Sequence, residues 1–127
     1  MEIFNRNQVL AFVTKDGSEI REILSPRNSS IERQSLAEAI LKLGEETEDH
    51  YHVHSEEIYY ILEGTGRMRI EKELWTVGPG DGIAILPGKR HKLWNTGERD
   101  LVFLCCCVPP YEHEDTVITK VISLPRK

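Results

Sequence analysis

Short apolar runs separated by turn residues account for most of the chain. From residue 50 onward, runs rich in Ile, Val, Tyr, Trp and Leu are broken by Gly, Pro, Asn and Asp at positions 63–66, 78–82, 87–88, 95–98 and 109–110. Many short strands at this spacing are typical of an antiparallel sandwich or small barrel, not of a parallel sheet covered by helices. The pattern therefore predicts an all-β fold.

The first third of the chain is less regular. Two short apolar segments, residues 8–13 and 19–24, flank a Lys-Asp-Gly-Ser turn, and residues 25–30 form a loop. Residues 33–43 are ambiguous, because Leu, Ala, Glu and Lys favour a helix by propensity. Leu36, Ile40 and Leu43 would share a helical face, whereas Ala37, Ala39, Leu41 and Leu43 alternate like one side of a strand. The periodicity leaves both structures open.

The end of the chain, residues 111–127, is polar apart from the apolar segment 117–124. Such a segment could pair at a sheet edge or against a second subunit.

Length and charge narrow the function classes. A chain of 127 residues is expected to form a single domain with one core. Sixteen basic and 21 acidic residues give a net charge of -5, spread along the chain without blocks. A nucleic-acid partner is therefore not expected.

The sequence also points away from membranes and secretion. The first 17 residues carry scattered charges and do not resemble a signal peptide. The longest apolar run, residues 101–108, is too short to span a bilayer. The three cysteines, Cys105, Cys106 and Cys107, are consecutive, so they offer no disulfide framework. A reduced, cytoplasmic protein without a membrane partner is the expectation.

Candidate metal ligands gather in residues 50–57. His50 and His52 are two positions apart, so in an extended strand both imidazoles point to the same side and can bind one ion. Glu56 or Glu57 could add a carboxylate. His91 follows a Pro-Gly bend and precedes another short strand, which makes it the candidate for a further ligand.

Two composite motifs carry a resemblance to the cupin family. The first reads Gly, His-x-His, Glu, Gly, and is matched at Gly44, His50, His52, Glu57 and Gly64. The second is matched at Gly80, Gly88, His91 and Asn95, except that Leu86 stands where the family has proline and Pro87 takes the next place. Two such motifs in the right order are a specific signal, whereas one His-x-His would be weak.

The resemblance implies a fold and an assembly. The fold would be a double-stranded β-helix, or jelly-roll, cupin barrel. One cupin domain would span residues 1–127, with its barrel core at about 35–110. Residues 33–43 would then be a strand, and small cupins of this kind pair as homodimers. Counting back from Gly64 selects Glu57 over Glu56 as the ligand.

The implied metal centre comprises His50, His52, Glu57 and His91. Three imidazoles and one carboxylate suit Fe, Mn, Zn, Ni or Co, and argue against Ca and Mg, which prefer oxygen ligands throughout. One or two positions would remain for water or a small-molecule ligand. The expected function is a metal-dependent enzyme acting on a small polar molecule, with isomerase, dioxygenase or lyase chemistry. A non-catalytic ligand-binding module and a purely structural metal are the alternatives.

Several further residues have two interpretations each. Glu57 could move a proton as well as bind the metal, and Tyr59 on the same strand face could bind substrate or simply pack.

His54 is interpreted as a bend residue in preference to a ligand, and His113 as a surface residue. Trp94 could line the pocket or pack in the core. The cysteines are expected to act as small hydrophobic residues, with ligation or modification of a nearby metal as the alternative. Arg67 and Arg69 are expected to be solvated, although one of them could bind a carboxylate or phosphate of a ligand.

Overall fold

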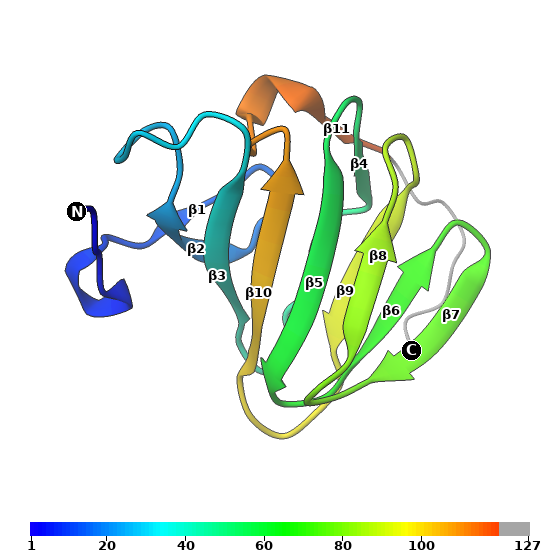
Figure 1. Cartoon of the computed structure of the whole chain (residues 1–127). Coiled ribbons are helices and arrows are strands. Elements are labelled where there is room, and N and C mark those ends of the chain that lie inside the picture. The colour runs from blue at the N-terminus through cyan, green and yellow to red at the C-terminus, as the bar shows by residue number, and fades with distance from the viewer. Residues whose placement is uncertain (120–127) are drawn as a thin grey trace.

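The computed structural model of the chain describes residues 1–119, which form two antiparallel β-sheets that face each other (Figure 1). The six-stranded sheet has the order β1 (Phe12–Val13), β2 (Glu19–Leu24), β3 (Ser35–Leu41), β10 (Leu101–Val108), β5 (Glu56–Glu63) and β8 (Gly82–Ile85). The five-stranded sheet has the order β11 (Thr116–Ile118), β4 (His50–His52), β9 (His91–Asn95), β6 (Gly66–Ile70) and β7 (Glu73–Val77). The predicted all-β fold is confirmed.

Helical structure in the described residues is limited to two short 3-10 turns, η1 (Arg6–Gln8) and η2 (His113–Asp115). Within residues 1–119, neither has the length or the apolar content to cross a lipid bilayer.

The core lies between the sheets and follows from strand alternation. On β5, Glu57, Tyr59 and Ile61 are buried, while Ile58 and Tyr60 face outward, as the sequence predicts. The strand β10 lies between β3 and β5, and its inward side chains complete the same layer. Fully buried apolar residues from both sheets meet there: Leu41, Ile61, Ile85, Leu93, Leu101 and Phe103.

The ambiguous segment is a strand. Residues Ser35–Leu41 pair with β2 on one side and β10 on the other, so their backbone groups are used in the sheet. Ala37, Ala39 and Leu41 face the core. The pairing on both edges outweighs the helical propensity of Leu, Ala and Glu. The strand interpretation of this segment is confirmed.

The start of the apolar tail forms β11, which pairs with β4 at the edge of the five-stranded sheet. This agrees with the predicted sheet-edge role. The rest of that predicted segment, from residue 120 onward, lies outside the described residues.

Gly64 allows β5 to turn into β6. Its backbone has φ +85°, and a Cβ atom there would lie 2.5 Å from the carbonyl oxygen of Asp100. Any side chain would therefore clash with the backbone that leads into β10. The glycine that ends the first motif is thus required by the shape of the barrel.

Arg69 does not follow its prediction. It was expected to be solvated, but its side chain is buried and forms an ion pair with the buried carboxylate of Asp49. Asp49 also pairs with Arg90, 3.1 Å away. Asp49 lies directly before β4, which β9 separates from β6 in the sheet. This buried acid keeps the arginine on this face of the sheet, a long-range pairing that alternation along β6 cannot reveal.

Candidate metal centre

Three histidines from two neighbouring strands converge between the sheets. His50 on β4 and His91 on β9 are direct cross-strand partners, and His52 follows on the same face of β4. All three side chains are buried, and one ring nitrogen from each lies within 4.8 Å of the others. Ligands held at about 2.1 Å from one ion are separated by about 3 to 4 Å, so this spacing is close to that of a metal site.

The Nδ1 atom of each imidazole ring lies next to a hydrogen-bond acceptor. The Nδ1 atoms of His50 and His91 lie 2.7 and 2.9 Å from the carbonyl oxygens of Glu48 and Lys89. A carbonyl only accepts, so each Nδ1 carries the proton. His52 Nδ1 is 3.1 Å from Thr116 Oγ1, whose own proton is donated to a backbone carbonyl. This arrangement directs the three Nε2 atoms inward.

Glu57 lies beside two of these nitrogens. Its Oε1 atom is 3.1 Å from His52 Nε2 and 3.5 Å from His91 Nε2. The second oxygen, Oε2, accepts a hydrogen bond from Cys107 Sγ at 3.3 Å. The structure therefore brings together His50, His52, Glu57 and His91, whereas the alternative acid Glu56 is exposed on the opposite face of β5.

The electrostatics of the four groups favour cation binding. Burial, followed by the nearby His91, lowers the pKa of His50 to about 4, so this ring is neutral. Burial alone would raise the pKa of Glu57, but the adjacent His52 and His91 outweigh it and hold that pKa well below its usual range. Burial would likewise lower the pKa of His52, yet the hydrogen bond and charge of Glu57 raise it above 6.5.

The donor set fits a transition-metal ion. His91 Nε2 is buried and has no hydrogen-bond partner among the described residues. Such an atom is costly to bury unless something satisfies it. Three inward Nε2 atoms, with His52 in its neutral form, and one ionised carboxylate are the ligands that Fe, Mn, Co, Ni or Zn accept.

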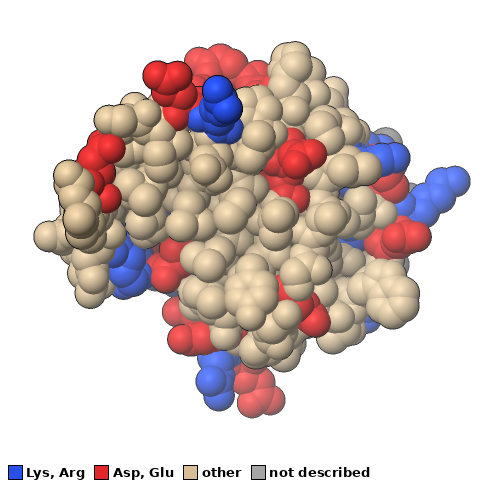
Figure 2. All heavy atoms as spheres, viewed as in Figure 1, with Lys and Arg blue, Asp and Glu red and all other residues tan. Residues whose placement is uncertain are grey.

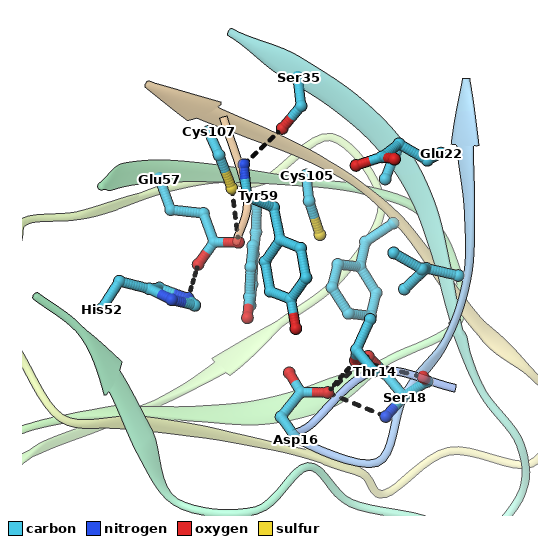
Figure 3. Close-up of a pocket in the computed structure, with 14 residues that line it drawn as sticks. Thr14, Asp16, Ser18, Glu22, Ser35, His52, Glu57, Tyr59, Cys105 and Cys107 are labelled. Atoms are coloured by element: carbon cyan, nitrogen blue, oxygen red, sulfur yellow. Dashed lines mark hydrogen bonds and ion pairs between the residues drawn. The ribbon is translucent and has the colours of Figure 1, made fainter. Parts of the chain in front are cut away.

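A small cavity opens beside the centre (Figure 3). The centre of a water molecule can occupy about 30 Å³ of this cavity. Tyr59 is buried, and Figure 3 shows its hydroxyl pointing into the cavity, away from Glu57. Burial raises the pKa of Tyr59, so the phenol stays protonated and can donate a hydrogen bond. Polar and apolar residues line the space: Thr14, Asp16, Ser18, Ile20, Glu22, Ser35, Ala37, His52, Glu57, Tyr59, Phe103, Cys105, Cys107 and Tyr111.

Other candidate residues lie away from the centre. The His54 side chain is 77% exposed and bonds to Asp115, in agreement with its interpretation as a bend residue. His113 is exposed on η2. Trp94 is buried but does not line the cavity. Asn95 secures its turn by donating to the carbonyl oxygens of Leu41 and Arg99.

Sequence reasoning missed one acidic residue at the centre. Asp16, in the turn between β1 and β2, has its Oδ2 atom 3.4 Å from His50 Nε2. The Lys-Asp-Gly-Ser pattern marks this position as a turn, but nothing in it signals proximity to a residue 34 positions later.

The chain is similar in sequence to an uncharacterized protein and to a polyketide synthase protein. The chain is 50% identical over 112 residues to an uncharacterized protein of Methanocaldococcus jannaschii, covering 88% of this chain and 90% of that protein. It is 29% identical over 86 residues to the polyketide synthase CurC of Streptomyces cyaneus, covering 68% of this chain and 56% of that protein.

The fold is shared with solved structures. The polyketide cyclase RemF from Streptomyces resistomycificus superimposes with a TM-score of 0.79 at 21% identity, covering 96% of this chain and 87% of that one. At this identity the likeness shows the fold alone. The family model described as Cupin domain matches residues 37–107, which include the three histidines and Glu57. The chain therefore belongs to the cupin family, and its two facing sheets are the jelly-roll barrel of that family.

Proposed function

We propose that this cupin is a metal-dependent enzyme that acts on a small polar molecule. One observation carries the proposal: three buried imidazoles have their Nδ1 atoms occupied by fixed acceptors, so that their Nε2 atoms converge beside an ionised glutamate. His50, His52, His91 and Glu57 would hold the ion. A bound transition metal would supply Lewis-acid or redox chemistry at this position.

The chain's own residues would orient the substrate. Tyr59 offers a protonated hydroxyl to an oxygen of a molecule in the cavity, because burial keeps its pKa raised. Glu57 remains ionised, and its Oε2 atom accepts a hydrogen bond from the Cys107 thiol. Its role would be mainly to provide negative charge to the metal, and Tyr59 would position the substrate. The apolar walls formed by Ile20 and Phe103 would limit the access of water.

The related proteins support a catalytic role for the fold. A polyketide cyclase shares it, and a polyketide synthase protein shares part of the sequence. Isomerase, dioxygenase and lyase reactions on oxygen-rich small molecules all remain consistent with a centre of this composition.

Turnover by the metal-loaded protein tests the proposal. Protein purified without oxygen would be loaded separately with Fe, Mn, Co, Ni and Zn, then incubated with small diketones, catechols, free sugars and sugar phosphates, while oxygen uptake and products are followed. Conversion that requires metal and falls at least about tenfold in Tyr59→Phe would support the enzyme. Saturable binding without any conversion would favour a non-catalytic binding module.

A further inference from the structure

Asp16 brings a second carboxylate to the candidate metal centre from a part of the chain outside the family match. The β1–β2 turn places Asp16 Oδ2 3.4 Å from His50 Nε2, while the matched residues begin at position 37. In Figure 3 the Asp16 carboxylate and the Tyr59 hydroxyl approach each other from opposite sides of the cavity.

The turn holds one oxygen of Asp16 and leaves the other free. Oδ1 accepts from Thr14 Oγ1 at 2.7 Å, and from the backbone nitrogen and Oγ of Ser18 at 2.9 and 2.7 Å. Oδ2 accepts no hydrogen bond within the described residues, and its one close polar contact there is His50. The three hydrogen bonds therefore aim Oδ2 at the centre.

The backbone fixes the turn itself. Gly17 has φ +95°, a left-handed conformation that favours glycine. The carbonyl oxygen of Asp16 accepts a hydrogen bond from the Glu48 nitrogen at 2.6 Å, two residues before His50. This hydrogen bond between Glu48 and Asp16 thus helps to position both Asp16 and His50, which face each other.

The charges around the cavity are unbalanced. Three carboxylates line it, from Asp16, Glu22 and Glu57, and no Lys or Arg is among its described lining residues. Glu22 is paired with Arg27 at 3.3 Å, and Glu57 faces two histidines. Asp16 accepts hydrogen bonds from uncharged groups only.

We propose that Asp16 determines ligand specificity at this site. Its free oxygen accepts a hydrogen bond from the hydroxyl of an uncharged ligand, such as a diol, a phenol or an enol, and its charge repels carboxylates and phosphates. This inference rests on the proposed function and narrows its substrate class to neutral hydroxyl compounds.

The test compares anion and hydroxyl ligands on cobalt-loaded protein. Wild type, Asp16→Asn and Glu22→Gln would each be loaded with Co(II) and titrated with azide and with catechol, while the visible cobalt bands report binding. Asparagine keeps the Oδ1 acceptor for Thr14 and Ser18, so the turn is retained. Glu22→Gln is the matched control, because that carboxylate lines the same cavity but is already paired with Arg27.

We expect azide to bind Asp16→Asn at least about tenfold more tightly than wild type, and catechol about tenfold more weakly, with smaller changes in Glu22→Gln. Unchanged azide affinity in Asp16→Asn with a full cobalt content would overturn this inference alone. A cobalt content below one ion per chain in that variant would also overturn it, by making Asp16 a metal ligand. A wild type that binds no cobalt would instead overturn the proposed function, and this inference with it.

Discussion

Cys107 and Glu57 are cross-strand partners on β10 and β5, and the Cys107 thiol donates to Glu57 Oε2 at 3.3 Å. The other carboxylate oxygen is thereby directed at His52 and His91. Burial and the charge of Glu57 raise the pKa of Cys107, so this thiol remains a neutral donor. The cysteines were expected mainly to act as small hydrophobic residues, but Cys107 orients a candidate ligand.

Removing the thiol should weaken metal binding. Cys107→Ala leaves Glu57 Oε2 without its donor, and we expect a loss of about tenfold in metal affinity, the lower end for groups that orient a ligand. Cys107→Ser keeps a donor and should retain most of the affinity. Competition with a chromophoric chelator measures the metal affinity of each variant. Cys105→Ala is the control, because Cys105 lines the cavity without bonding to Glu57. Equal losses in both alanine variants would contradict this role.

Thr116 is expected to stabilise the metal-free fold through His52. Thr116→Val preserves shape but leaves the buried Nδ1–H of His52 without an acceptor, at a cost of about 1 to 3 kcal/mol in the free energy of unfolding. Urea denaturation measures this difference. Thr116→Ser retains the hydroxyl and should lose much less; a serine variant as unstable as the valine variant would point to the lost methyl group instead.

The affinity for metal should fall with acid. His52 must be neutral to bind an ion, and its pKa is raised, so below that pKa each bound ion displaces its proton. Displacement of this one proton should make the affinity loss approach about tenfold per pH unit below that pKa, with His50 contributing only near pH 4. Isothermal titration calorimetry in buffers of different ionisation enthalpy counts the released protons. No proton release near neutral pH would contradict the assignment of His52 as a ligand.

The same shift predicts the opposite trend for the metal-free protein above pH 6.5. A histidine whose folded pKa is raised contributes stability that is fully present below its unfolded pKa of about 6.5 and is lost as pH rises through the folded value. The melting temperature of metal-free protein should therefore fall from pH 6.5 upward, while that of metal-loaded protein does not. Parallel melting curves for the two forms would be inconsistent with this linkage.

Several apolar side chains are exposed on or next to β5, β8 and β10, on the outer side of the six-stranded sheet, and we propose that this region forms a homodimer interface. Ile58, Tyr60, Leu86 and Val108 are between 44% and 57% exposed. Figure 2 shows this face as mostly uncharged, with a few Asp and Glu side chains within it and Lys and Arg mainly near its margin. Exposed apolar surface of this kind commonly marks an interaction site.

A charge placed on that face should separate the subunits. In sedimentation analysis, wild type should be a dimer and Ile58→Glu a monomer with an intact metal site. Trp75→Glu is the control, since Trp75 is exposed on the other sheet, at β7, and its variant should remain dimeric. A monomeric wild type would refute the interface.

Much of the fold was predictable because strand alternation is a local property. The inward positions of Glu57, Tyr59 and Ile61 follow from their spacing, and Gly64 marks the required turn. The two-residue spacing of His50 and His52 likewise fixes a common side. The strand at Ser35–Leu41 needed the family resemblance, because propensity and pairing oppose each other there.

The remaining parts of the site depend on contacts between distant segments. Asp16 reaches His50 only because its turn bonds to the Glu48 backbone, and no local pattern records that contact. The partners of the histidine Nδ1 atoms are largely backbone carbonyls, which every residue has. The pairing of Arg69 with Asp49 is similarly long-range.

Metal content is the most direct test of the central claim that His50, His52, Glu57 and His91 hold one ion. Wild type, His91→Ala and His54→Ala would be loaded with each of Fe, Mn, Co, Ni and Zn and dialysed, and elemental analysis would give the ions per chain. His54→Ala is the control, because His54 is exposed and bonds to Asp115. We expect one ion per chain in wild type and His54→Ala, and almost none in a folded His91→Ala. A wild type that retains none of these metals, or a His91→Ala variant that retains them fully, would contradict the account.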